Sequence, residues 1–426
     1  MFHGYNRDMM LLSNWKGVCF MITRERYMRQ IRPFINTDLI KVLTGLRRCG
    51  KSVMLILIQA ELMVLQVPPQ NLISLNFEDL DSVALRDSEK LHRYLLDKIK
   101  PLHGRAYVFL DEIQEVPAWE KCVNSLRVKC DADIYVTGSN ANLLSGEFAT
   151  VLGGRYVAFT IYPFCLAEFL EALAQREPGI ETSAAFTRYL TLGGMPFLSN
   201  LSSSREAAQQ YLRDIYDSVV LKDVVSRCNI RDVDLLSRII NYVIANVGKT
   251  FSATSISAFL KSEKRSTTPE TVLNYIKACQ SAYFFYKTPR QDLQEGKRIL
   301  SVGEKYYLAD HGIREALYGK NMRDIELVLE NIVCMELLSR GFSVTVGKIG
   351  QAEIDFVAEK QGEPLYIQVS YLLAEEKTIA REFGSLAAVK DNYPKLVLSM
   401  DEIDLSRDGI RHMHVRDFLL QADNAV

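Results

Sequence analysis

Paired cysteines and long apolar runs are both scarce in this sequence. The eight cysteines are scattered without a C-x-x-C pair, which argues against a zinc site and indicates reduced thiols in the cytoplasm. A membrane-spanning helix needs about 18 consecutive apolar residues, whereas the longest candidate, Val53–Ile58, is followed by Gln59 and then Glu61. The sequence therefore predicts a cytoplasmic protein without a membrane partner.

An excess of charge of either sign is also lacking. The chain has 51 Lys and Arg against 52 Asp and Glu, a net charge of −1, so the protein as a whole does not attract DNA, RNA or anionic membranes. Contact with nucleic acid would need a local basic patch. The composition, 48% hydrophobic and 24% charged, is that of a globular protein, and 426 residues predict about three domains.

Residues 1–22 are predicted to be a leader outside the domains. Polar and charged residues interrupt its moderately apolar stretch, Met9–Met21, and no small-residue cleavage site follows. A secretory signal is therefore not expected. Met21 is an alternative start of the protein.

The strongest motif lies between an expected strand and an expected helix. The aliphatic run Leu39–Thr44 precedes Gly45–Ser52, which matches G-x-x-x-x-G-K-S, and a helical stretch from Val53 to about Leu65 follows. This order is the context that a P-loop requires. The predicted nucleotide-binding residues are Gly45, Leu46, Arg47, Arg48, Cys49, Gly50, Lys51, Ser52 and Val53.

The fixed residues of this motif each have a physical role. Gly45 and Gly50 permit backbone geometry that lets consecutive N–H groups surround phosphate oxygens, and the start of the helix adds partial positive charge. Lys51 would reach the β- and γ-phosphates, while the Ser52 hydroxyl would complete the coordination of Mg²⁺. ATP and Mg²⁺ are therefore the predicted cofactors.

Two acidic residues end a second buried strand. Ala106–Leu110 is followed directly by Asp111 and Glu112. A carboxylate at this place can hold the metal, and a second one can deprotonate the attacking water. We assign Asp111, with Ser52, to the metal and Glu112 to the base.

Further strands alternate with helical segments, which predicts a parallel α/β sheet covered on both faces. One of these strands falls between the two nucleotide motifs, as in ATPases with an added catalytic glutamate. The expected strands are Asn71–Phe77, Asp133–Thr137 and Tyr156–Ile161.

Five motifs together carry a family resemblance: Gly45–Ser52, Val108–Gln114, Thr137–Asn140, Gly154–Arg155 and Tyr162–Phe164. They resemble archaeal and bacterial AAA-type P-loop ATPases that have a C-terminal domain of uncharacterised function. The resemblance runs from about Ile22 to near the C-terminus. It implies an AAA-like P-loop ATPase domain over residues 23–200.

The resemblance also implies roles for individual residues. Asn140 or Ser139, at the tip of the fourth strand, would contact the γ-phosphate or the attacking water. Arg155 would act as an arginine finger, because a guanidinium neutralises charge on the transferring phosphoryl group; an ordinary surface or interdomain salt bridge is the alternative. The predicted catalytic residues are Glu112, Lys51, Asn140 and Arg155.

A winged helix-turn-helix is predicted within a helical domain over residues 201–303. Helices are expected at Phe251–Leu260 and from Pro269 to Gln280, the second capped by Thr268. The hairpin is expected to consist of a strand at Ser281–Thr288, a turn at Gln291–Lys297 and a return strand at Lys305–Leu308.

DNA is a candidate partner of this domain, since such a helix can enter the major groove. The alternative is that the domain is a packing module and its basic residues are ordinary solvation. The residues that would supply local positive charge are Lys261, Lys264, Arg265, Lys277, Lys287 and Arg290.

The pattern of residues 304–426 resembles the PD-(D/E)XK nuclease fold. Glu330 or Glu336 would be the helix acid and Asp355 the strand-end aspartate, but Gln368–Ser370 lacks the lysine of the third element. We therefore predict a degenerate restriction-endonuclease-like α/β domain in which nuclease activity is not expected, unless Lys377 or Lys390 substitutes.

The primary prediction is a Mg²⁺-dependent AAA-type ATPase whose hydrolysis of ATP drives or gates movement of the C-terminal domains. One alternative is a switch similar to STAND regulators, which binds DNA or signals with little turnover. The other is an ATP-gated nuclease. The sequence leaves open a protein partner and the oligomeric state.

Overall fold

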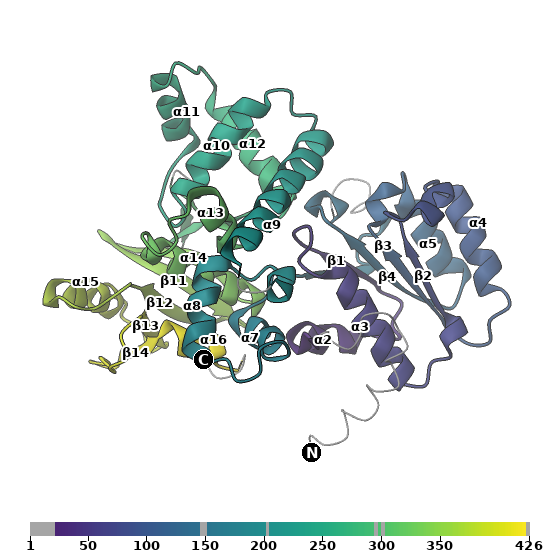
Figure 1. The fold of residues 1–426 in the computed structure, drawn as a ribbon, viewed down its shortest axis with the longest axis horizontal. Coiled ribbons are helices and arrows are strands. Elements are labelled where there is room, and N and C mark those ends of the chain that lie inside the picture. The colour runs from purple at the N-terminus through teal and green to yellow at the C-terminus, as the bar shows by residue number, and fades with distance from the viewer. Residues whose placement is uncertain (1–21, 145–150, 202–203, 294–296, 300–302, 423–426) are drawn as a thin grey trace. The chain divides into compact units, whose positions relative to one another are not determined.

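The computed structural model describes residues 22–144, 151–201, 204–293, 297–299 and 303–422. The predicted leader therefore lies outside the described residues, except for Ile22. The chain divides into two compact units after Ile161, and each is described by itself (Figure 1). The domain boundaries expected near residues 200 and 303 stay predictions. Among the described helices, none is long and apolar enough to cross a membrane.

The first unit is built on a five-stranded sheet with the order β2-β3-β4-β1-β5, in which every pairing is parallel. Every residue of β1, β3 and β4 is buried, as expected for central strands covered on both faces. The parallel P-loop core predicted from the sequence is thereby confirmed. The strands are β1 Ile40–Thr44, β2 Leu72–Asn76, β3 Ala106–Asp111, β4 Ala132–Gly138 and β5 Tyr156–Thr160.

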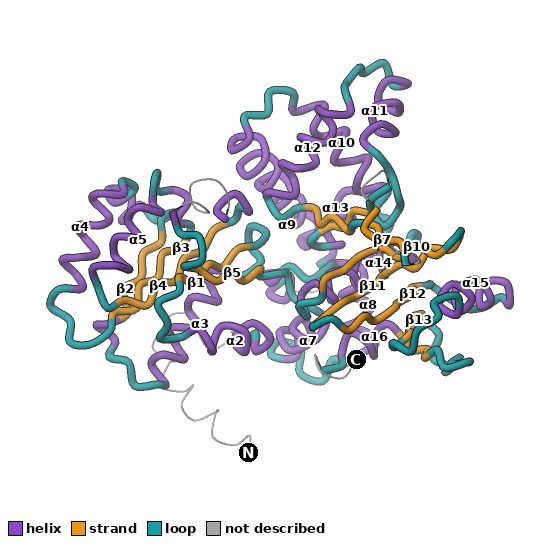
Figure 2. Tube along the Cα trace, turned by 180° about the vertical axis from the view of Figure 1, so that it is seen from behind, coloured by secondary structure: helices purple, strands orange, loops and turns teal. Residues whose placement is uncertain are grey.

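Helices cover both faces of this sheet. Figure 2 shows α4 and α5 on one face and α3 with α2 on the other. Apolar side chains of α4 and α5 join those of the strands in one core, which includes Leu91, Leu95 and Val123. The helices are α2 Glu25–Ile31, α3 Lys51–Val64, α4 Ser88–Ile99 and α5 Trp119–Lys129.

The second unit begins with helices and a two-stranded hairpin. The Thr268 hydroxyl accepts a hydrogen bond from the Thr271 N–H and so caps α12, as predicted. The helices are α7 Leu166–Ala174, α8 Thr182–Leu192, α9 Arg205–Ser218 with a π-helical continuation at Val219–Ser226, α10 Val233–Ala245, α11 Ala253–Ser262 and α12 Pro269–Ser281. In the hairpin, β6 Phe285–Thr288 pairs antiparallel with β9 Lys305–Leu308.

Two details of the expected hairpin were wrong. The first strand starts at Phe285 because α12 continues through Ser281. The segment expected as a turn, Gln291–Lys297, overlaps the end of β7, Arg290–Asp292, and the first residue of β8, Lys297–Ile299. These strands leave the hairpin because β7 pairs with β10 of the following sheet.

That second sheet has seven strands in the order β14-β13-β12-β11-β10-β7-β8 and mixes parallel with antiparallel pairs. It is compatible with the predicted nuclease-like α/β domain. Its remaining strands are β10 Ser343–Ile349, β11 Ala352–Lys360, β12 Glu363–Val369, β13 Lys395–Ser399 and β14 Arg411–His414. Its helices are α13 His311–Tyr318, α14 Ile325–Ser339, α15 Glu376–Ala387 and α16 Val415–Leu420.

Candidate nucleotide-binding site

The glycine loop joins the end of β1 to the start of α3, and both of its glycines have positive φ angles that other residues rarely adopt. Gly45 has φ +143°, and a Cβ there would lie 2.1 Å from the carbonyl oxygen of Ile161. Gly50 has φ +105° and immediately precedes α3. Other residues rarely adopt these angles. The loop therefore depends on glycine at both positions.

Lys51 is the first residue of α3 and is buried. Its Nζ donates to the carbonyl oxygens of Gly45, at 3.2 Å, and Leu46, at 3.1 Å. It also lies 3.8 Å from Oε1 of Glu112. The ammonium is thus folded over the loop, next to the carboxylate that the sequence assigns to the base.

The two residues predicted to hold the metal are in contact. Asp111, the last residue of β3, is hydrogen-bonded to Ser52 and Thr137. Burial raises the pKa of Asp111, while these two hydrogen bonds act in the opposite direction. Hydroxyl and carboxylate oxygens are the donors that Mg²⁺ prefers. The pair Ser52 and Asp111 therefore fits this ion.

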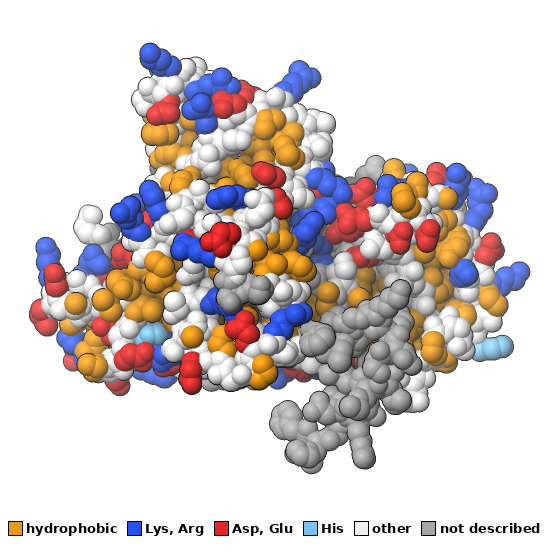
Figure 3. All heavy atoms as spheres, viewed as in Figure 1, with side chains coloured by type: hydrophobic (Ala, Val, Ile, Leu, Met, Phe, Trp, Pro, Cys, Tyr) orange, Lys and Arg blue, Asp and Glu red, His pale blue; other side chains and the backbone are white. Residues whose placement is uncertain are grey.

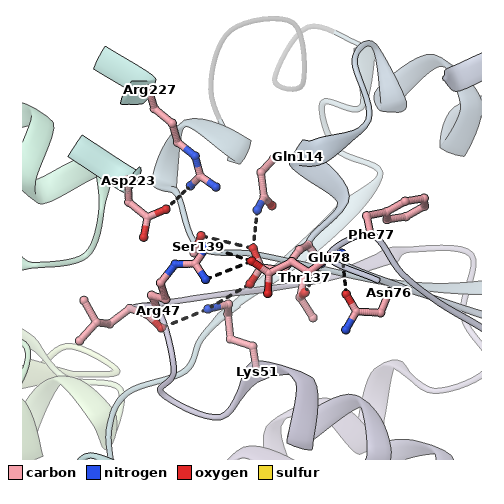
Figure 4. Close-up of polar contacts among 12 residues, drawn as sticks. Arg47, Lys51, Asn76, Phe77, Glu78, Gln114, Thr137, Ser139, Asp223 and Arg227 are labelled. Atoms are coloured by element: carbon pink, nitrogen blue, oxygen red, sulfur yellow. Dashed lines mark hydrogen bonds and ion pairs between the residues drawn. The ribbon is translucent and has the colours of Figure 1, made fainter. Parts of the chain in front are cut away.

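Glu112 is buried and held by several neighbours. Its φ is +54°, in the left-handed region, and its N–H donates to Oγ1 of Thr137 at 2.9 Å. Its carboxylate accepts hydrogen bonds from Nε2 of Gln114 and from Oγ of Ser139, the latter at 3.3 Å. Figure 4 shows Lys51, Gln114, Thr137 and Ser139 converging here from different elements.

Thr137 and Gln114 were not assigned roles from the sequence. Thr137 touches both acidic residues because β3 and β4 are neighbours in the sheet. Gln114 follows Glu112 by two positions and sits where a Cβ on Gly138 would lie 2.6 Å from its Oε1. Both residues stand inside motifs that carried the family resemblance, which is the only sequence signal for them.

The P-loop has two further fixed contacts. Arg24, a buried side chain that sequence reasoning missed, donates to the Cys49 carbonyl oxygen at 2.9 Å. Arg47 pairs with Glu78, just after β2, at 3.0 Å, as Figure 4 shows. Burial raises the pKa of the Cys49 thiol, which keeps it neutral. These contacts fix the loop from both of its flanks.

Asn140 and Arg155 lie at opposite edges of the sheet. The register pairs Thr44 with Gly138, so buried Asn140 follows β4 on the P-loop side. Arg155 precedes β5, and its carbonyl oxygen accepts from the N–H of Ile40 at the start of β1. The length of β1, five residues of about 3.3 Å each, separates Arg155 from the loop.

This placement contradicts a role for Arg155 as the arginine finger of the P-loop in its own unit. Its guanidinium instead donates to Asn124 Oδ1 and to the Val151 carbonyl oxygen, both at 3.3 Å, on the surface. The physical reason is strand direction, since parallel strands place their starts and ends at opposite edges.

In the second unit, the predicted nuclease-like residues come together in part. Glu330 of α14 and Asp355 of β11 both contact Nζ of Lys305, each at 3.3 Å. Glu336 instead pairs with Arg340 at 2.7 Å, so Glu330 is the helix acid beside Asp355. Burial and then Asp355 raise the pKa of Glu330 to about 8, although Lys305 lowers it.

The other expectations for this cluster meet mixed outcomes. Gln368 contacts the cluster, because its Oε1 accepts a hydrogen bond from the Asp355 N–H at 3.2 Å. The lysine in the cluster is Lys305 from β9, not Lys377 or Lys390, and Lys390 donates to the Ala387 carbonyl oxygen. Within the described ranges, no group of three or more His, Cys, Asp and Glu side chains is arranged to hold a metal.

Half of the basic residues expected to attract DNA are neutralised by acidic partners in the second unit. Arg265 pairs with Asp232, Lys287 with Glu304, and Arg290 with Glu353. Lys261, Lys264 and Lys277 are exposed. On the face drawn in Figure 3, basic, acidic and apolar side chains alternate over the helices of this region without a continuous basic area.

A phosphate-binding loop between the first strand and its helix, in a parallel sheet with acidic strand ends, defines the class of P-loop nucleoside triphosphatases. A family model described as "AAA domain" matches residues 37–170, and a model for a domain of unknown function matches residues 183–324. The chain belongs to the AAA-type P-loop ATPase family.

Two curated relatives match nearly the whole chain. An uncharacterised protein of Haemophilus influenzae is 38% identical over 402 residues, covering 94% of this chain and 99% of that protein. An uncharacterised protein of Methanocaldococcus jannaschii is 29% identical over 398 residues, covering 88% of this chain and 83% of that protein.

Similar solved structures include the Aeropyrum pernix ORC2 protein in ADPNP–ADP complexes, with 12% identity, coverage of 73% of this chain and 92% of that chain, and a TM-score of 0.37. A STAND protein of Pyrococcus horikoshii with a tetratricopeptide repeat sensor has 14% identity, coverage of 87% and 48%, and a TM-score of 0.31.

Proposed function

We propose that the chain binds ATP with Mg²⁺ at Gly45–Val53 and hydrolyses it to ADP and phosphate. The observation that carries this proposal is the meeting of Lys51, the Ser52–Asp111 pair and Glu112 at one edge of the sheet. These groups supply a cation for the phosphates, oxygen ligands for a metal and a carboxylate for water.

The residues of the site would divide the work as follows. The N–H groups of the glycine loop would bind the β- and γ-phosphates, and Lys51 would leave its present carbonyl partners to contact them. Ser52 and Asp111 would hold Mg²⁺, which offsets charge on the phosphate oxygens. Glu112 would accept a proton from the attacking water, and Asn140 or Ser139 would orient that water.

The test compares ATP binding and turnover in the wild type, Lys51→Ala and Glu112→Gln. We expect Lys51→Ala to lose ATP binding, measured by calorimetry. Glu112→Gln should still bind ATP but turn over at least about 100-fold more slowly, because an amide cannot accept the proton. Lys90→Ala and Glu89→Gln, which change exposed residues of α4, should match the wild type. Undiminished turnover in Glu112→Gln would refute the assignment of the base.

A second candidate function is a nucleotide-gated switch with little turnover, as in STAND-type regulators. One observation favours it: Glu112 is already bound by Gln114 and Ser139, and Lys51 by loop carbonyls. Both groups must therefore rearrange before they can act. Nucleotide retained through purification, with less than about one turnover per hour in the wild type, would select the switch over the ATPase.

DNA is the partner that we propose for the helix-turn-helix of the second unit. The supporting observation is that Lys261, Lys264 and Lys277 are exposed on α11, α12 and the segment between them. A protein partner is the alternative. In either case, hydrolysis of ATP would act on the partner by moving the second unit. Stimulation of turnover by DNA would support the first, and indifference to DNA the second.

A further inference from the structure

The second unit contains a buried lysine surrounded by carboxylates. Lys305 Nζ lies 3.1 Å from Glu353 Oε1 and 3.3 Å from both Glu330 Oε2 and Asp355 Oδ1. The side chains of Lys305, Glu330 and Asp355 are 4%, 11% and 11% exposed. A single ammonium therefore fills the point where three carboxylates converge. We call Lys305, Glu330, Glu353 and Asp355 the lysine cluster.

The remaining atoms around the cluster fix the carboxylates in place. Tyr307 donates to Glu330 Oε2 at 3.2 Å, and the Val369 N–H donates to Asp355 Oδ2 at 3.0 Å. Arg290 pairs with Glu353 from the other side, at 3.2 Å. The acids are thus oriented by neighbours on β7, β9 and β12, and they do not depend on the lysine alone for their position.

The backbone of Gly248 also lies against the lysine cluster. Gly248, with φ +73°, lies so near that a Cβ on it would be 2.9 Å from Glu330 Oε2. Its segment follows α10, and Lys305 itself belongs to the β6–β9 hairpin. Glu330 and Asp355 belong to the helix and strand of the seven-stranded sheet. The cluster therefore joins the hairpin to that sheet inside one compact unit.

A buried charge is unfavourable unless it is paired, so Glu330 and Asp355, which are nearly buried, need a positive charge beside them. Glu353 is 35% exposed and also pairs with Arg290. Either an ammonium or a divalent cation meets this need, since both bind oxygen donors. The distances of 3.1–3.3 Å from Lys305 Nζ are those of ion-paired hydrogen bonds. A divalent ion could occupy the same point only if the ammonium were absent.

We propose that Lys305 is the resident cation of this site: its ammonium takes the place of a divalent metal ion and ties the β6–β9 hairpin to α14 and β11. Removing the ammonium, while keeping the carboxylates, opens a site for an oxygen-binding divalent cation.

The experiment measures Mn²⁺ binding to the nucleotide-free full-length protein by electron paramagnetic resonance. Lys305→Ala is expected to gain one Mn²⁺ with a dissociation constant of roughly 0.1–1 mM, as in weak oxygen sites. The gain should disappear in Lys305→Ala combined with Asp355→Asn, which separates it from any binding at Ser52 and Asp111. Lys287→Ala, which removes an exposed lysine of the same hairpin, should gain nothing.

Two results would overturn the proposal. One is a Mn²⁺ ion bound by the wild type and absent from Asp355→Asn, which would make the cluster a metal site with Lys305 in place. The other is a folded Lys305→Ala protein that gains no ion. If Lys305→Ala does not fold without metal, circular dichroism should show that millimolar Mn²⁺ restores its helices. Failure of Mn²⁺ to restore them would equally reject the proposal.

Discussion

The Glu112 carboxylate accepts hydrogen bonds from the Gln114 amide and from the Ser139 hydroxyl. Gln114 donates to this carboxylate from one side, and the Oε1 atom of the same amide is buried without a hydrogen-bond partner in the described structure. This oxygen lies against Gly138, where an added Cβ would be 2.6 Å from it. Gln114 is therefore a positioning residue for the proposed base.

Gln114→Ala tests this positioning role. We expect kcat for ATP hydrolysis to fall roughly 10-fold with little change in KM, because the carboxylate loses the bond that orients it while the phosphate contacts stay intact. Steady-state kinetics on the purified variant would measure both constants. Gln70→Ala, at an exposed glutamine of the same unit, is the control. A change in KM alone would show that Gln114 acts on binding instead.

The end of α8 and the start of α13 meet without room for side chains. A Cβ on Gly193 would lie 2.0 Å from Asp310 Oδ1, and one on Gly312 would lie 1.9 Å from the Leu192 carbonyl oxygen. Asp310 accepts hydrogen bonds from the N–H groups of Gly194, at 2.7 Å, and Gly312, at 2.8 Å. One buried carboxylate thus fastens the turn after α8 to α13.

This fastening predicts a pH dependence of stability. Burial raises the pKa of Asp310 to about 6, although the two backbone hydrogen bonds lower it. The folded state then holds a proton more tightly than the unfolded state, whose aspartate titrates near 3.9. The contribution of Asp310 to stability therefore falls as pH rises from about 4 to 7, by roughly 3 kcal/mol.

Asp310→Asn should remove that slope. We expect the variant to be less stable than the wild type at pH 5, since an amide cannot accept both N–H groups, and the difference to shrink at pH 8. Urea unfolding followed by circular dichroism at both pH values would measure it. Asp217→Asn, at an exposed position of α9, should keep the wild-type slope. A constant difference between pH 5 and pH 8 would contradict the prediction.

The elements that sequence patterns predict well are those whose chemistry is local. Gly45–Ser52 and the acidic end of β3 could be found because neighbouring residues in the chain carry the function. The position of Arg155 could not be predicted from the sequence, because it depends on the edge of the sheet at which β5 begins. Lys305 was missed because its partner Asp355 lies 50 positions away on another strand.

Because the charges of the whole molecule are nearly balanced, DNA binding would depend on a few exposed lysines. Net charge of −1 supplies no general attraction, and Arg265, Lys287 and Arg290 are paired with acids. Any binding through the predicted helix-turn-helix would therefore rest on the exposed lysines of α11, α12 and their connection. Each lysine that neutralises a phosphate releases counterions, so the affinity must fall steeply with salt.

The triple variant Lys261→Ala, Lys264→Ala and Lys277→Ala decides whether these lysines bind DNA. If they do, the affinity for a labelled duplex, measured by fluorescence anisotropy at about 50 mM salt, should fall. The slope of log affinity against log salt should decrease by about one for each phosphate that is no longer neutralised by a lysine. Removing three exposed lysines of the first unit, Lys90, Lys98 and Lys100, takes away the same charge and should leave both quantities unchanged. An equal effect of the two triple variants would mean that binding is unspecific attraction by surface charge, and the absence of wild-type binding at this salt would remove DNA as the partner.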